Sequence, residues 1–540
     1  MSGNQKKVDK RAGESHYDRG MRLEDEGRVL DAIAEYRKAI EQSPDLLDLY
    51  TRLGDLLESS EQPDEAERIY REGVQRFPDD PTLRTVLGNM LDERGQPAPA
   101  LDQYQAAVRL KPDFAPYHYN VGNALSHMDR DEEAVTAYQE AIRLQPDWAW
   151  PHFNLGLELR GLGKQGAALA EFQEAVRLDS GSSDYWAKLG QALLDIDRFR
   201  EAVEACEQAT CLDPEDDEAY GWLGSALQEL GQDEACARAF EQATRLRPDN
   251  AWAHYRLAFA YERLGRDQEA ITEYDRVIGL DPGNWWPHFN KGNCLDRLER
   301  YSEAVSEYTK ASEFNPQDEV IFLNLGLTLS RLGQIEDAGR ALETSIQLNP
   351  DIGDTHYALG LAQRRMSNWE RAADEFMTAS RLSPRDFDTR WNLAHTLRKL
   401  GDLDRAIAEY REAIALNPGD SFAHSDLGES LLKKGEVDDA IAECREAIRL
   451  DPSDATAHAY LGEALAMKGD TDAAISAYRE SARLHPQDSE VFFCLGVLLA
   501  QEGRNEEARG AWEKAAALPS DEFVEHAREA LNAMSSDKDA

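Results

Sequence analysis

The sequence has few cysteines, no long apolar run and a shortage of basic residues. Its six cysteines in 540 residues include no CxxC pair, which excludes the usual zinc and redox motifs and favours buried, reduced thiols. No stretch approaches the roughly 18 consecutive apolar residues of a membrane-spanning helix. The first residues, MSGNQKKVDKRA, carry charges and no apolar segment. No signal peptide is expected, and the sequence predicts a cytoplasmic protein.

The charge is strongly one-sided. The chain has 60 basic and 103 acidic residues, a formal net charge of −43. Nucleic acids and anionic membranes are bound through Lys and Arg. The composition therefore predicts a protein that binds neither.

A period of 34 residues organises the chain. The tetrapeptide PHFN at residues 151–154 returns at residues 287–290, four periods later. Fifteen repeats without insertion or deletion cover Gly13 to Glu522 when the first begins at Gly13, the second at Leu47 and the last at Ser489. Positions inside a repeat are numbered here as places 1 to 34. A fixed period of this size is typical of solenoids.

Four places are nearly constant. Place 8 is Gly or Ala in every repeat, and place 20 is Ala in fourteen repeats and Cys236 in the other. Place 24 is mostly Tyr or Phe, and place 32 is Pro in thirteen repeats. Small residues at places 8 and 20 allow two helices to approach closely, and an aromatic ring at place 24 fills the space beside them. Pro then ends the second helix.

The apolar pattern predicts two helices in each repeat. Places 4, 7, 8 and 11 form one helical stripe, and places 20, 24 and 27 form a second. A residue such as Gly163 near place 15 interrupts the chain between them. Ser520 to Met534 is expected to be a C-terminal helix that caps the last repeat, with Ser520 at its start. Residues 1–12 and 535–540 are expected to be disordered tails.

These places resemble the tetratricopeptide repeat, which has an aromatic residue or His at place 4, Gly at 8, Ala at 20, an aromatic residue at 24 and Pro at 32. The resemblance covers 510 of the 540 residues. It implies an all-α fold, a right-handed superhelical solenoid of fifteen hairpins whose first helices line a concave groove. It also implies a non-catalytic scaffold for a protein or peptide partner.

Two patterns that could indicate chemistry have a structural interpretation. Eight of the twelve histidines, including His152, stand at place 4 on the packing face of the first helix. They are expected to seal helix junctions, and no metal site or cofactor is predicted. The sequence GLGKQG, Gly161 to Gly166, satisfies GxGxxG but lies between two predicted helices and not after a strand. The chain is therefore not expected to be an enzyme.

Asparagines are candidates for holding a partner. Places 2, 6, 9 and 13 share the side of the first helix opposite the packing face. An amide side chain can both donate to and accept from a peptide backbone. The pattern resembles the asparagine ladder in the repeat region of O-linked N-acetylglucosamine transferase, without its catalytic domain. Descent without binding is the alternative interpretation. The candidates at place 6 are Asn120, Asn154, Asn290, Asn324 and Asn392.

Place 13 changes sign along the chain. Acidic residues such as Asp195 and Glu229 occur there in the first seven repeats. Basic residues follow in repeats eight to thirteen, namely Arg263, Arg297, Arg331, Arg365, Lys399 and Lys433. A cation near a helix C-terminus is favoured by the helix dipole alone. The second interpretation is that these residues attract an acidic partner segment.

The sequence thus predicts an interaction scaffold that binds an extended or acidic segment in its groove. One alternative is a co-chaperone, but Tyr119 and Asp184 stand where its carboxylate clamp requires bases around Asn123, Asn154 and Lys188. Another is the substrate-recruiting subunit of a separate enzyme. The oligomeric state and the partner's identity are not predicted.

The junction at residues 180–183 is predicted to be a hinge, because Ser180 replaces the expected Pro and SGSS follows the helix. Limited proteolysis should cut first near Gly181, and Ser180→Pro should slow that cut. Equal cleavage at several other junctions would contradict the prediction.

Overall fold

A computed structural model describes residues 15–536, and every element in this part of the chain is an α-helix. The predicted N-terminal tail at residues 1–12 and residues 537–540 of the predicted C-terminal tail lie outside it, whereas residues 535 and 536 of that predicted tail are helical. The first helices of the fifteen repeats are α2 (His16–Asp25), α4 (Leu47–Ser59), α6 (Pro81–Glu93), α8 (Ala115–Ser126), α10 (Ala149–Gly161), α12 (Ser183–Leu194), α14 (Asp217–Glu229), α16 (Ala251–Arg263), α18 (Trp285–Arg297), α20 (Glu319–Leu332), α22 (Gly353–Arg365), α24 (Phe387–Leu400), α26 (Ser421–Lys434), α28 (Ala455–Lys468) and α30 (Ser489–Gln501).

A second helix follows each of these. The second helices are α3 (Val29–Gln42), α5 (Pro63–Arg76), α7 (Pro97–Leu110), α9 (Asp131–Leu144), α11 (Gln165–Leu178), α13 (Phe199–Leu212), α15 (Asp233–Leu246), α17 (Asp267–Leu280), α19 (Tyr301–Phe314), α21 (Ile335–Leu348), α23 (Trp369–Leu382), α25 (Leu403–Leu416), α27 (Val437–Leu450), α29 (Thr471–Leu484) and α31 (Asn505–Ala516). The helical hairpins expected from the period are confirmed.

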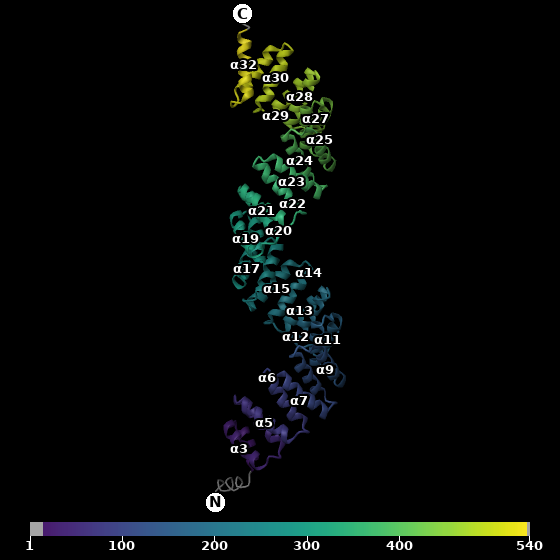
Figure 1. Cartoon of the computed structure of the whole chain (residues 1–540), viewed down its shortest axis with the longest axis vertical. Helices are drawn as coiled ribbons and strands as arrows, with labels where there is room; N and C mark the ends of the chain where they lie inside the picture. The colour runs from purple at the N-terminus through teal and green to yellow at the C-terminus, as the bar shows by residue number, and fades with distance from the viewer. Residues whose placement is uncertain (1–14, 537–540) are drawn as a thin grey trace. The chain divides into compact units, whose positions relative to one another are not determined.

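The chain divides into two compact units between Glu273 and Tyr274. Within each unit the hairpins follow one another in chain order, as α8 to α13 do in the first unit and α20 to α25 in the second (Figure 1). Within a unit, a first helix packs on its own second helix and on the second helix of the preceding repeat, as α24 does on α25 and α23. Each unit is therefore an α-solenoid held together by neighbouring repeats.

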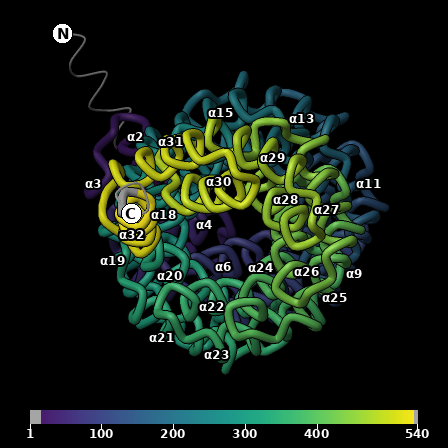
Figure 2. Tube along the Cα trace, turned by 90° about the horizontal axis from the view of Figure 1, so that it is seen from above, coloured from purple at the N-terminus to yellow at the C-terminus, as the bar shows by residue number. Residues whose placement is uncertain are grey.

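The two kinds of helix lie on different sides of a unit. In the second unit α22, α24 and α26 lie on the inner side of the curved trace, and α21, α23 and α25 lie on the outer side (Figure 2). Places 2, 6, 9 and 13 belong to the first helices. We call the surface that they form the first-helix surface.

The predicted approach of the two helices at place 8 is confirmed. A Cβ atom added to Gly122 would lie 2.5 Å from Cε1 of Tyr138, and one added to Gly54 would lie 2.1 Å from Cε1 of Tyr70. The Ala residues at place 20, such as Ala134, are fully buried. The aromatic ring at place 24 thus packs directly on the glycine of the first helix.

The turn between the two helices depends on the backbone at place 15. This residue has a positive φ in every repeat, as at Gly163 (φ 72°) and Asp197 (φ 60°). The left-handed conformation ends the first helix and favours glycine. The predicted interruption near place 15 is therefore confirmed.

The cysteines only partly follow the expectation of burial. Cys206, Cys236, Cys294 and Cys444 are buried free thiols, whereas Cys494 is half-buried and Cys211 is exposed. Cys206 and Cys444 replace the aromatic ring at place 24, against Gly190 and Gly428. Cys211 is the penultimate residue of α13.

The last helix, α32 (Glu522–Ser536), packs on α30 and α31. Val524 and Ala527 are fully buried. The oxygen of Asp521 accepts the N–H of Val524 at 2.8 Å, so the N-terminal cap is one residue later than the predicted Ser520. The helix also extends two residues beyond Met534.

At the predicted hinge, α11 ends at Leu178 and α12 begins at Ser183. The indole N–H of Trp186 donates to the carbonyl of Ser180 at 3.0 Å. Flexibility at residues 180–183 stays a prediction.

We expect Gly292→Val to destabilise the ninth repeat by about 2–3 kcal/mol, the usual scale of overpacking. A Cβ there would lie 2.7 Å from Cε1 of Tyr308. Urea denaturation of the full chain, together with hydrogen exchange of α18 and α19, would measure the loss. The matched control is Gly510→Val in α31, where a Cβ meets no atom within 4 Å. Equal losses for the two variants would show that the close approach at place 8 is not the cause.

Candidate functional site

The asparagines on the first-helix surface form hydrogen bonds between neighbouring repeats. In α8 and α10 the hydroxyl of Tyr138 donates to Oδ1 of Asn123 at 2.8 Å, and Nδ2 of Asn154 donates to the same oxygen at 3.1 Å. Nδ2 of Asn154 also lies 3.2 Å from the hydroxyl of Tyr119. Burial raises the pKa of Tyr138, so its hydroxyl remains a donor.

This arrangement recurs along the surface. The hydroxyl of Tyr308 donates to Oδ1 of Asn293 at 2.7 Å, and Nδ2 of Asn324 donates to that oxygen at 3.3 Å. Asn120 forms the equivalent bond to Asn89 at 3.4 Å. The amide N–H of the asparagine at place 6 therefore donates to the amide oxygen of the asparagine at place 9 of the preceding repeat. This bond orients both amide groups.

The remaining two candidates differ from that pattern. Asn392 is buried, and its Nδ2 donates to the carbonyl of Asp388 at 2.8 Å. Its Oδ1 accepts a guanidinium N–H of Arg364. Asn290 is half-buried on α18. Asn392 thus has a structural role, whereas the side chains of the repeating pairs are less enclosed.

The pairs retain hydrogen-bonding capacity. Among the described residues no hydrogen bond uses the amide N–H atoms of Asn123 or the carbonyl oxygen of Asn154. Each pair therefore offers one donor and one acceptor, which is what an extended backbone requires.

At least three of the six basic residues at place 13 pair with acids. Arg263 lies 2.8 Å from Asp233, Arg331 forms an ion pair with Asp296, and Lys433 lies 2.6 Å from Glu429. Arg365 instead donates to the carbonyl of Ser330 at 3.1 Å, near the end of α20. Arg297 lies 3.3 Å from the sulfur of Cys294, and Lys399 is exposed.

Charged residues at place 13 can pair with a residue of opposite charge at place 12 of the preceding repeat. In the first unit Arg160 at place 12 pairs with Asp195 at place 13 of the next repeat at 2.5 Å. At Asp296 and Arg331 in the second unit the charges are exchanged, and Asp92 at place 12 in the first unit likewise lies 3.0 Å from His127 at place 13. Sequence reasoning considered place 13 alone and missed place 12. The net field on the first-helix surface is consequently weaker than a count of its arginines implies.

The histidines at place 4 seal the repeat junctions, as predicted. In six repeats Nδ1 of the imidazole lies 2.6 Å from a glutamate at place 23, in the pairs His16–Glu35, His152–Glu171, His254–Glu273, His288–Glu307, His356–Glu375 and His424–Glu443. The other nitrogen of His152 faces the carbonyl of Pro146 in the preceding repeat at 3.3 Å. We call this imidazole–glutamate pair the junction pair.

Sequence reasoning missed the glutamate partner, although the sequence contains the information. Place 23 is Glu wherever a histidine forms the pair, and Ala in the repeats of His118 and His458. His118 bonds the carbonyl of Pro112 at 2.8 Å. Arg390 takes the same position as the histidines and pairs with Glu409 at 2.8 Å. Residues at places 4 and 23 therefore vary together.

The junction pairs alter proton affinities. The bond to Glu443 raises the pKa of His424. Burial opposes protonation of His152, but Glu171 and the carbonyl of Pro146 outweigh it and raise its pKa. Burial likewise would raise the pKa of Glu307, but His288, Lys310 and Lys291 lower it to about 2. The junction pairs therefore favour the charged forms of these groups.

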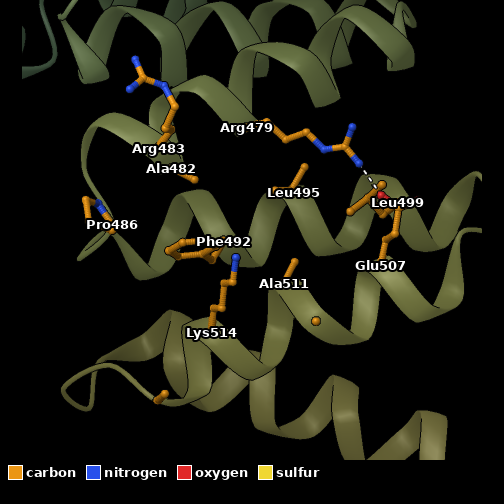
Figure 3. Close-up of a pocket in the computed structure, with 12 residues that line it drawn as sticks. Arg479, Ala482, Arg483, Pro486, Phe492, Leu495, Leu499, Glu507, Ala511 and Lys514 are labelled. Carbon is orange, nitrogen blue, oxygen red and sulfur yellow. Dashed lines mark hydrogen bonds and ion pairs between the residues drawn. The ribbon is translucent and has the colours of Figure 1, made fainter.

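A cleft is also present away from the first-helix surface. A cleft of about 720 Å³ in the second unit is bordered by α29, α30 and α31 (Figure 3). Phe492, Leu495 and Leu499 form its floor and are already buried, and Arg479 at its rim pairs with Glu507. An occupant would gain little apolar contact there, so we do not assign the cleft a function.

Two negative findings apply to residues 15–536. No three His, Cys, Asp or Glu side chains in this range converge as a metal site would require. No helix in the same range is long and apolar enough to cross a membrane.

We expect His424→Gln to lower the free energy of unfolding by about 1 kcal/mol at pH 6, the scale of one hydrogen bond. The pKa of His424 is raised in the folded state above the reference value of 6.5. The pair therefore contributes fully below pH 6.5, and its contribution is lost as the pH rises through the folded pKa. The difference from wild type should shrink between pH 6 and pH 9 in urea denaturation.

The control for this prediction is His485→Gln, because His485 is 61% exposed in its side chain and stands outside place 4. This variant should match wild type at both pH values. A loss for His424→Gln that is equal at pH 6 and pH 9 would mean that the neutral imidazole forms the pair equally well.

Comparisons with solved structures give several partial likenesses. YrrB, described as a TPR protein with an unusual peptide-binding site, is 23% identical over 36% of this chain and 97% of its own, with a TM-score of 0.33. The Cut9–Hcn1 complex matches at 17% identity over 83% of this chain and 95% of that one, with a TM-score of 0.33. A repeat protein from Cytophaga hutchinsonii matches at 15% identity over 45% and 99%, with a TM-score of 0.41. No curated protein matches.

Family profiles account for most of the sequence. Those described as tetratricopeptide repeat match residues 153–235 and 323–522 in overlapping segments, and also residues 23–90, 251–284 and 287–318. Profiles described as TPR repeat match residues 122–159 and 225–265. Since these matches exceed half of the chain and agree with the helical hairpins, the protein belongs to the tetratricopeptide repeat family.

Proposed function

We propose that the protein is a non-catalytic scaffold whose first-helix surface holds an extended segment of a protein partner. Tetratricopeptide repeats are in general protein-binding modules, and the family membership supports the scaffold role. The observation that carries the finer proposal is the oriented amide pair, as at Asn123 and Asn154 or Asn293 and Asn324. Each pair leaves a donor and an acceptor for a peptide backbone, which can be held without reading its sequence.

We propose further that the partner segment carries acidic residues that approach place 13 in the second unit. Lys399 and Arg365 support this most directly, because neither forms an ion pair with a carboxylate among the described residues. Arg331 and Lys433 contribute less, since acids of the chain already pair with them. Guanidinium and ammonium groups would attract an acidic segment to a chain that otherwise repels it.

The co-chaperone alternative has weaker support. Lys188, the single base of the nearest clamp match, lies 3.1 Å from Glu218 and is thereby partly neutralised. A substrate-recruiting subunit would use the same first-helix surface. Identification of the captured partner by mass spectrometry distinguishes an enzyme from other partners.

We expect the double variant Arg365→Glu, Lys399→Glu to weaken partner binding about tenfold or more, the scale of one charge-assisted hydrogen bond. Affinity capture with the full chain, followed by titration calorimetry with the captured partner, would measure this change. Binding by the wild type should also weaken as salt is raised.

The matched control is Glu229→Lys. Glu229 is an exposed place 13 residue of the first unit and forms no ion pair among the described residues. Its affinity for the partner should stay within about twofold of wild type, because Arg365 and Lys399, the cations expected to bind the partner, are unchanged. A second arm, Asn293→Ala with Asn324→Ala, tests the amide pairs. If only the asparagine variant loses the partner, the acidic specificity is wrong. If neither variant changes binding, the first-helix surface is not the binding site.

A further inference from the structure

A cleft on the first-helix surface of the second unit combines aromatic rings with carboxylates. It lies between α24 and α26 and has a volume of about 520 Å³. Its lining residues are Phe387, Trp391, His395, Asp420, Phe422 and Asp426. None of these residues is in the amide ladder or the basic set described above.

The amide pair is absent at this junction, as at most others. Place 9 of the twelfth repeat is His395 and place 6 of the thirteenth is Asp426. Arg398 connects them, since its Nη2 lies 3.1 Å from Nδ1 of His395 and 3.5 Å from Oδ1 of Asp426. Place 5 is Trp391 in the twelfth repeat and the small residue Ser425 in the thirteenth.

The aromatic walls retain exposed surface. Phe422, at place 2, is 65% exposed. No ring contact is recorded for it among the described residues, whereas Trp150 at the same place packs edge-on against Tyr185 at 5.7 Å. Trp391 stacks on His395 at 5.6 Å between ring centroids. An exposed aromatic surface of this kind indicates a binding site more often than an isolated apolar residue does.

The charged side chains that line the cleft are carboxylates, whereas the cations Arg398, Arg364 and Lys399 lie near His395 without lining it. Asp420 and Asp426 line it, and Glu429 lies on the next turn of α26. The guanidinium of Arg398 is buried, with only 6% of its side chain exposed, and it is committed to Asp426 and Glu429. Burial and the nearby Arg398 lower the pKa of His395 to about 4, so the imidazole adds no positive charge.

We propose that this cleft binds a cationic side chain, an arginine or a lysine, of the partner segment. The faces of Trp391, Phe387 and Phe422 attract a cation through their quadrupoles, and Asp420 and Asp426 supply carboxylate acceptors. A neutral apolar side chain would desolvate these carboxylates without compensation. The inference rests on the proposed scaffold function and adds a specific feature: the bound segment carries one basic residue among its acidic ones.

The test uses small probes and the full chain. Acetyl-arginine methylamide and its neutral citrulline counterpart are titrated while the indole N–H resonances are followed by NMR. The Trp391 resonance is assigned as the one that Trp391→Phe removes. We expect a saturable shift of this resonance with the arginine probe, at a dissociation constant in the millimolar range, and at least fivefold weaker binding of the citrulline probe. Equal binding of the two probes would overturn the proposal.

Two variants locate the probe. Phe422→Ala and Asp426→Asn should each weaken arginine binding at least fivefold. Phe422 is exposed, so its truncation should leave the fold intact. If Asp426→Asn disturbs Arg398 and the local structure, Phe422→Ala still tests the proposal. The matched control is Val320→Ala, at place 2 of the tenth repeat and 43% exposed, which should leave binding unchanged. Unchanged binding in Phe422→Ala would also overturn the proposal.

Failure of the proposed cation site can be distinguished from failure of the scaffold proposal. If the arginine probe fails to bind while Arg365→Glu, Lys399→Glu still loses the partner, the cation site alone is wrong. If the probe binds at Trp391 while the partner is insensitive to every first-helix variant, the cation site stands and the scaffold proposal fails.

Discussion

The contact between place 8 and place 24 is the constraint on which the rest of the structure depends. The two helices of a repeat close because the residue at place 24 lies against the small residue at place 8, as the ring of Tyr138 does against Gly122 and the thiol of Cys206 does against Gly190. This contact fixes the distance and the rotation of the two helices, and hence which side of the first helix is buried. The places that remain outside, 2, 6, 9 and 13, are those available for a partner.

Most of the fold could be predicted from the sequence because it depends on places that repeat. Gly at place 8, Ala at place 20 and the turn at place 15 each act within one repeat, so a single pattern determines fifteen hairpins. The junction pair was only half predicted. His152 was placed correctly at a helix junction, but Glu171 is 19 residues away. Its role follows from the covariation of two places, which a position-by-position comparison does not show.

The candidate site was less predictable, because side chains on the first-helix surface contact the neighbouring repeat. Asn392 has the residue type of the ladder but is buried against Asp388 and Arg364. Arg331 has the charge expected of an acidic-segment site, yet Asp296 compensates it. Residue type and helical phase indicate where a side chain lies. They do not indicate which neighbour has already bound it.

The second bond of the junction histidines has a consequence for how such a chain can grow. The imidazole of His356 reaches back to the main-chain carbonyl of Pro350, and its other nitrogen bonds Glu375 within its own repeat. A main-chain carbonyl is offered by any preceding repeat, whatever its side chains. This bond does not depend on the side chains of the preceding repeat, so it can persist when repeats are duplicated or exchanged and their outward residues diverge.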